Sequence, residues 1–144
     1  MHRTAAESLR VRVAGWTRDV EDLRRSKAEA ATDSDFISTM VGRYASAVLG
    51  EVDVLELLPM FEEALARTNS PRFATLLCQL ITEVMGLCGQ PEVGLKYFRR
   101  AVETALIDLE WIDRCPALEP LRSLPGFAEG RRQVRARVEA IWHA

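Results

Sequence analysis

Histidine is scarce in this sequence, and its scarcity limits the chemistry that the chain can perform. The 144 residues include two histidines, His2 and His143, one near each end, where chains often fray. A histidine-based metal site or general base therefore has almost no material to work with. We accordingly expect a protein that is not an enzyme, with no catalytic residues, no cofactor and no metal site.

Cysteine is also scarce, and long apolar runs are missing. The three cysteines, Cys78, Cys88 and Cys115, are an odd number without paired spacing, which indicates reduced, structural thiols. No stretch approaches the roughly 20 apolar residues of a membrane span, and the first ten residues lack the apolar core of a signal peptide. We expect a cytoplasmic protein with no membrane partner.

Charge is unevenly spread along the chain, but no segment carries a large excess of positive charge. The formal net charge is −2, and residues 35–110 carry 6 basic and 11 acidic side chains. Nucleic-acid binding depends on a pronounced basic face, so a nucleic acid is an unlikely partner. Hydrophobic residues make up 48% of the chain and charged residues 28%, which is ordinary for one globular domain spanning residues 1–144.

Residues 70–106 have the pattern of two antiparallel helices, and the rest of the chain is arranged around them. Ser70 can cap a helix that starts with Pro71, and Gly89 can end it in a left-handed conformation. Pro91 then starts a second helix. Apolar residues recur at threes and fours in both segments, which predicts helices with one buried face each.

Five positions of this hairpin resemble the second half of a tetratricopeptide repeat. Met85, Gly89, Gly94, Phe98 and Ala101 stand in the order and spacing of a large apolar residue, a turn glycine, a small residue, an aromatic and an alanine. The resemblance implies close backbone packing at the small residues. It also implies a short right-handed array of stacked hairpins that binds another protein on its inner surface.

Residues 34–67 are predicted to form a first, looser hairpin. The polar run over residues 32–35 can start a helix that ends at Gly50, and Pro59 should kink the next helix or mark its start. The segment FEEALA at 61–66 matches FRRAVE at 98–103 with an offset of 37 residues. This offset is near the roughly 34-residue period of tetratricopeptide repeats.

Residues 1–31 are predicted to form one long N-terminal helix with a heptad seam. The seam is spaced by four, three, four and three residues, at Leu9, Val13, Trp16, Val20 and Leu23. One interpretation is a helix that lays this seam on the rest of the domain. The alternative is a self-associating module in which the seam forms a homodimer, so that assembly is the function.

Residues 108–142 resemble the closing segment of tetratricopeptide-type domains, and also the ends of helical-repeat regions in bacterial, notably myxobacterial, serine/threonine protein kinases. Pro116 can open a short helix carrying Leu118 and Leu121, and Phe127 enters a last, capping helix. The inner stripe of that helix is predicted at Val134, Val138, Ile141 and Trp142. No kinase motif is present, so a kinase link would come by association or excision from a longer chain.

Two charged clusters allow a functional or a structural interpretation. Asp108, Glu110 and Asp113 lie beside Arg114 at a junction between helices, where acidic residues cap helices and pair with arginine. We therefore expect that cluster to be structural. The last helix carries Arg131, Arg132, Arg135 and Arg137. They could make this helix a nucleic-acid or ligand-binding regulator, or simply form a solvated face.

Together these patterns predict an all-α interaction domain in a bacterial signalling or kinase-linked pathway. Its function would be that of a non-catalytic adaptor that binds another protein. Projecting the repeat frame onto the first helix of each hairpin predicts partner contacts at Arg43, Ser46, Gln79 and Glu83.

Overall fold

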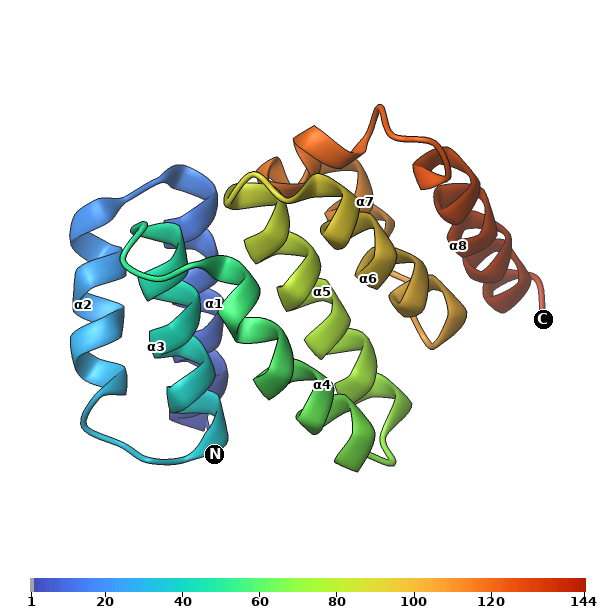
Figure 1. The fold of residues 1–144 in the computed structure, drawn as a ribbon. Coiled ribbons are helices and arrows are strands. Elements are labelled where there is room, and N and C mark those ends of the chain that lie inside the picture. Colours follow the sequence, from blue (N-terminus) through green and yellow to red (C-terminus); the bar gives the residue numbers. More distant parts are fainter. Residues whose placement is uncertain (1) are drawn as a thin grey trace. The chain divides into compact units, whose positions relative to one another are not determined.

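A computed structural model describes residues 2–144, with side chains described from Ala6 onward. The side chain of His2 therefore lies outside the described residues. The described chain is all-helical and contains no strand, which confirms the predicted fold class (Figure 1). Its contacts fall into two compact units rather than one, Met1–Leu58 and Pro59–Ala144.

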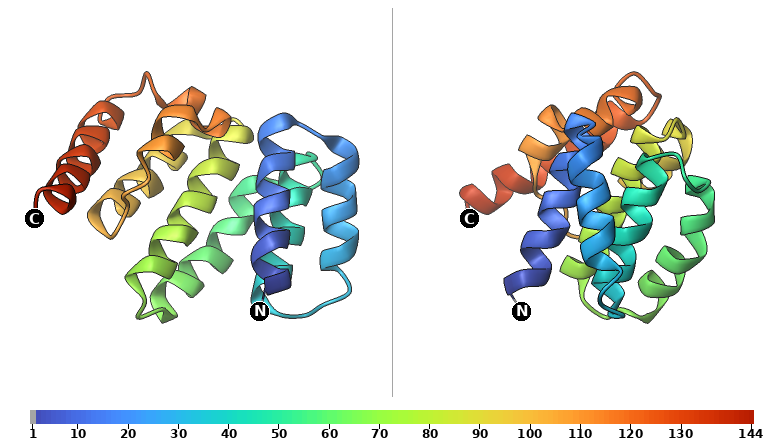
Figure 2. Two further views of the ribbon diagram at one scale, coloured as in Figure 1. Left: turned by 180° about the vertical axis from the view of Figure 1, so that it is seen from behind. Right: turned by 90° about the vertical axis from the view of Figure 1, so that its left-hand side faces the viewer.

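The first unit is built from three helices that all contact one another, α1 (His2–Thr17), α2 (Val20–Ala30) and α3 (Phe36–Val48), followed by the 3-10 turn η1 (Val54–Leu57) (Figure 2). Side-chain caps start two of these helices: Asp19 accepts a hydrogen bond from the Asp22 amide, and Asp35 accepts one from the Ser38 amide. The buried apolar residues of this unit include Val11, Ala14, Leu23, Met40, Val41 and Tyr44.

The predicted single helix over residues 1–31 is wrong, because the chain turns between α1 and α2. Arg18 has φ of 56°, and Asp19 caps a new helix. Val11 and Ala14 form the buried face of α1, whereas Leu9 and Val13 are 54% and 42% exposed. The seam therefore neither continues through both helices nor packs on the domain along its length.

Pro59 marks an irregular helix start, as predicted. Gly50 follows α3 with φ of 74°, η1 follows, and α4 (Leu58–Arg67) carries Pro59 in its first turn, where no backbone N–H is needed. The boundary between the two units falls at Leu58. It divides the predicted hairpin over 34–67, since α3 packs with α1 and α2 in the first unit.

The second unit contains the predicted central hairpin, formed by α5 (Pro71–Leu87) and α6 (Pro91–Glu103), which lie side by side (Figure 1). The Ser70 hydroxyl accepts a hydrogen bond from the Phe73 amide at 3.2 Å, and Gly89 adopts φ of 75°. Both end signals therefore act as the sequence predicts. From Leu80 to Leu87 every residue of α5 is buried.

The closing segment consists of α7 (Leu109–Arg114), the 3-10 helix η2 (Pro116–Leu121) and α8 (Phe127–Trp142). Leu118 and Leu121 are buried, as predicted, and Phe127 stacks on Phe98 with ring centroids 4.6 Å apart. The predicted inner stripe of α8 is only partly right. Val134 is buried, but α8 extends past the core, so that Ile141 and Trp142 are 58% and 82% exposed.

Two backbone approaches show how tightly the second unit is packed. A Cβ atom on Gly94 would lie 3.3 Å from the Thr82 carbonyl oxygen, which agrees with the predicted small residue at this position. The closer approach was not predicted: a Cβ atom on Gly86 would lie 2.0 Å from the carbonyl oxygen of Ala117. A side chain at position 86 therefore requires η2 to move away from α5.

We expect Gly86→Ala to lower the free energy of unfolding by about 1–3 kcal/mol or more, because the new methyl group meets backbone rather than a flexible side chain. Gly42→Ala is the matched control in α3: its Cβ would lie 3.7 Å from the Ala30 Cβ, an ordinary contact. That change should stabilise the chain by about 0.5–1 kcal/mol through helix propensity. Urea unfolding followed by circular dichroism measures both, and a neutral Gly86→Ala would contradict the packing described.

Candidate functional site

The most open hollow described in the first unit lies between α2 and α3, and we call it the α2–α3 pocket. Its volume is about 270 Å³. The residues that line it are Lys27, Ala30, Ala31, Asp33, Ser38, Thr39, Gly42, Arg43 and Ser46. Two of the four predicted partner-contact residues, Arg43 and Ser46, are thus found together in one pocket.

Small residues on the two facing helices create the hollow. Ser38, Gly42 and Ser46 are spaced by four residues and therefore share one face of α3. Ala30 lies opposite on α2. A Cβ atom added to Gly42 would lie only 3.7 Å from the Cβ atom of Ala30. The helix backbones can approach closely here, and no long side chain fills the space that remains beside them.

The charged groups around the α2–α3 pocket differ in how far they are already satisfied. Lys27 forms an ion pair with Glu51, and the Asp33 carboxylate accepts hydrogen bonds from the Ser34 and Asp35 amides. Arg43 is exposed and has no hydrogen bond or ion pair within the part of the chain that the structure describes. Its guanidinium is therefore available to an incoming anionic group.

The hydroxyl groups of the pocket also differ in whether they have a hydrogen-bond partner. Ser38 donates to the Asp35 carboxylate at 3.0 Å, and Thr39 donates to the Asp35 carbonyl oxygen at 3.0 Å. Ser46 is only 8% exposed, and among the described residues its hydroxyl has no hydrogen-bond partner. The Ser46 hydroxyl is therefore free to form a hydrogen bond with a ligand.

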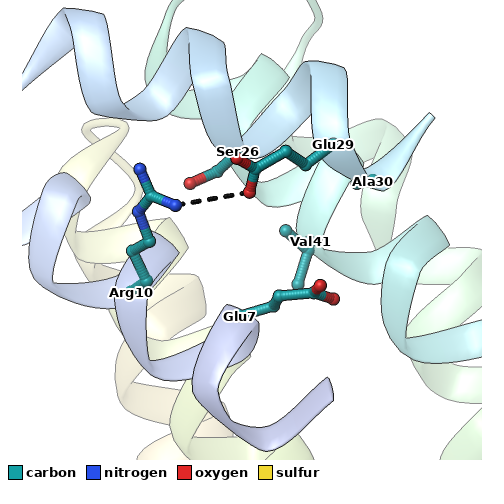
Figure 3. Close-up of a pocket in the computed structure, with 6 residues that line it drawn as sticks. All are labelled: Glu7, Arg10, Ser26, Glu29, Ala30 and Val41. Atoms are coloured by element: carbon teal, nitrogen blue, oxygen red, sulfur yellow. Dashed lines mark hydrogen bonds and ion pairs between the residues drawn. The ribbon is translucent and has the colours of Figure 1, made fainter. Parts of the chain in front are cut away.

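A second, enclosed cavity lies between α1, α2 and α3 (Figure 3) and has a structural role. It measures about 10 Å³, which is at the lower limit for one water molecule. Arg10 reaches across it to Glu29 at 3.3 Å and also binds Asp22 at 2.5 Å. The hydrogen bond from Arg10 holds the pKa of the Asp22 carboxyl below its usual range. This network joins the helices and leaves no room for a ligand.

The two partner-contact residues predicted in the second unit, Gln79 and Glu83, lie on α5 and do not line the α2–α3 pocket. Gln79 is half-buried on α5. Glu83 is 0% exposed, and its carboxylate accepts a hydrogen bond from Trp111 Nε1 at 2.7 Å. In this structure Glu83 therefore has no exposed surface to offer a partner, since it is buried and bonded to Trp111 of α7; its predicted partner contact stays a prediction.

The arginines of α8 are all engaged within the second unit. Arg137 donates to the carbonyl oxygen of Val102 at the end of α6 and to that of Leu106 just beyond the helix. The other three pair with carboxylates: Arg131 with Asp113, Arg132 with Glu129, and Arg135 with Glu139. These partners favour the structural interpretation of the basic face.

The acidic cluster at the start of the closing segment is structural, as expected. Asp108 accepts a hydrogen bond from the Trp111 amide at the start of α7, and Glu110 pairs with Arg114. The Arg131 hydrogen bond lowers the pKa of Asp113. All three carboxylates thus cap a helix or pair with an arginine of the second unit.

One titratable cluster in the second unit was not predicted. Tyr97 donates a hydrogen bond to Glu62, which lowers the pKa of that carboxyl, and Arg100 binds the same oxygen at 2.7 Å. Burial raises the pKa of Tyr97 to about 12 and that of the nearby Cys78 thiol to about 11. Both groups stay protonated at neutral pH, so the cluster ties α4 to α6 and does not form a reactive centre.

Two searches for other kinds of site give negative results. The part of the chain that the structure describes contains no group of three histidine, cysteine or acidic side chains arranged to hold a metal ion. None of its described helices combines the length and the apolar character needed to cross a bilayer. In the comparisons with known proteins, no family model, curated protein or solved structure matches the chain.

We expect Trp111→Phe to lower the free energy of unfolding by about 2 kcal/mol, because the buried Glu83 carboxylate loses a charged hydrogen bond while the ring volume largely remains. Trp142→Phe is the matched control: Trp142 is 82% exposed, so its replacement should be nearly neutral. Urea unfolding compares the two. Equal effects would contradict the core role given to Glu83.

Proposed function

We propose that the chain is a non-catalytic protein-interaction domain that holds a segment of another protein in the α2–α3 pocket. One observation carries the proposal: Arg43 and the hydroxyl of Ser46 have no partner among the described residues and belong to a hollow lined largely by small residues. Unpaired polar groups next to apolar surface are typical of a site that a partner completes.

The size and charge of the pocket favour a protein partner over two other ligands. At about 270 Å³ it falls below the roughly 300–1,000 Å³ of typical cofactor and small-molecule sites. The first unit carries 8 basic and 10 acidic side chains over residues 1–58, whereas nucleic-acid binding needs many uncompensated cations. A single protruding side chain of a protein partner fits a pocket of this volume and does not need a strongly basic surface.

The proposal includes a tetratricopeptide-like arrangement, with the hairpins as a short right-handed array. It also places the protein in the cytoplasm of a bacterium, within a kinase-linked or other signalling pathway. The support is the α5–α6 hairpin, in which Gly94 allows close backbone packing and Phe98 and Ala101 are buried. Domains of this kind act as adaptors by offering grooves between helices.

An affinity capture from lysate tests this function, with residues 1–144 as bait and the captured proteins identified by mass spectrometry. We expect one dominant protein that is recovered by the unaltered chain and lost by Ser46→Leu, which fills the α2–α3 pocket. Arg24→Gln is the matched control, since Arg24 is an exposed arginine of α2 that does not line the pocket. It should retain the partner.

Two outcomes would contradict the proposed function. In the first, the bait recovers only itself under conditions where all variants are folded by circular dichroism. In the second, Ser46→Leu and Arg24→Gln lose the captured protein equally, which would indicate a surface that is not specific to the pocket.

A further inference from the structure

We infer that the α2–α3 pocket recognises an aliphatic side chain and a neighbouring carboxylate side chain in the same partner segment. This inference rests on the proposed function and specifies its ligand. The pocket combines an apolar floor with one uncommitted cation at its edge, so each part of such a segment has a counterpart.

The floor of the pocket accepts apolar atoms. Ala30 and Ala31 contribute small apolar side chains, Gly42 contributes backbone without a side chain, and Lys27 also lines the pocket. The Lys27 ammonium is paired with Glu51, so its charge is already compensated. A branched aliphatic side chain of the partner would bury its methyl groups against these atoms.

The charges at the edge of the pocket orient the carboxylate. Arg43 has no partner among the described residues and presents a planar fork that binds a carboxylate through two hydrogen bonds. Asp33 lines the same pocket and is fixed by the Ser34 and Asp35 amides, so it repels a second anion on its side. The carboxylate should therefore lie over Arg43 and away from Asp33.

Ser46 supplies the remaining polar contact. Ser46 lines the pocket and its hydroxyl has no described partner, so it can bind the backbone of a segment whose side chain fills the hollow. Since Asp33 opposes more negative charge and Arg43 is the one uncommitted cation lining the described pocket, a singly charged carboxylate fits better than a phosphate group.

The test uses NMR of the ¹⁵N-labelled full chain and three capped dipeptides as probes. The first is N-acetyl-leucyl-glutamate amide. The second has glutamine in place of glutamate, and the third has alanine in place of leucine. We expect the first to cause saturable shifts at the amides of Gly42, Arg43 and Ser46. The other two should bind about tenfold more weakly or worse, since each lacks one of the two recognised groups.

Variants assign each preference to its residue. Arg43→Gln should remove the preference for glutamate over glutamine, and Ser46→Leu should abolish the shifts. Gly42→Ala, whose added methyl group fits without a clash, should weaken the leucine preference by narrowing the hollow. Arg24→Gln should behave as the unaltered chain does, because its side chain lies outside the pocket.

Three results would overturn the inference. The first is the absence of localised shifts up to about 10 mM probe, a range that covers millimolar affinities. The others are equal binding of the three dipeptides and an unchanged glutamate preference in Arg43→Gln. The proposed function fails separately. If lysate capture gives a partner that Ser46→Leu keeps while the dipeptides do not bind, the inference fails and protein binding stands. If the dipeptides bind as expected and capture recovers only the bait, the ligand chemistry stands and the adaptor function fails.

Discussion

The burial of α5 is the constraint on which the second unit depends. Every residue from Leu80 to Leu87 is buried, and Gly86 brings α5 against the backbone of η2 more closely than any side chain would allow. The same burial encloses Glu83, whose carboxylate is held by Trp111. A helix used in this way as the core has little surface left for a partner, so its role is to hold the hairpin and the closing segment together.

The first unit is built differently and leaves a different surface. Its helices meet through small residues such as Ala30 and Gly42, which bring the backbones together but leave a hollow alongside. Most charges around that hollow are used internally, by the Lys27–Glu51 pair and by the turn at Asp33. Arg43 and Ser46 remain unsatisfied, and this difference between the two units places the proposed binding surface in the first.

Local signals predicted the elements well where the deciding atoms lie within a few residues. The Ser70 cap, the turn at Gly89 and the start of η2 at Pro116 were all read correctly from the chain. The break at Arg18 was missed, because the heptad spacing outweighed a valid capping signal, Asp19 followed three residues later by Asp22. Spacing alone does not show whether a helix continues.

Features made by distant segments could not be predicted from the sequence. The repeat frame placed Glu83 on α5 but gave neither its burial nor its hydrogen bond to Trp111, which is 28 residues away in the chain. The same holds for Gly86 and Ala117. In the pocket, Arg43 and Ser46 of α3 are residues that the frame named, and their contact with a partner stays a prediction. Lys27 and Asp33 became part of the pocket only through the packing of α2.

The most direct test of this account is site-specific photo-crosslinking in cells of the source organism. A benzophenone amino acid would replace Thr39, an exposed residue at the edge of the α2–α3 pocket, or the exposed Arg24 outside it. The account predicts one dominant crosslinked protein from position 39 and none from position 24. The same crosslinks from both positions, or a partner captured from position 24 alone, would contradict it.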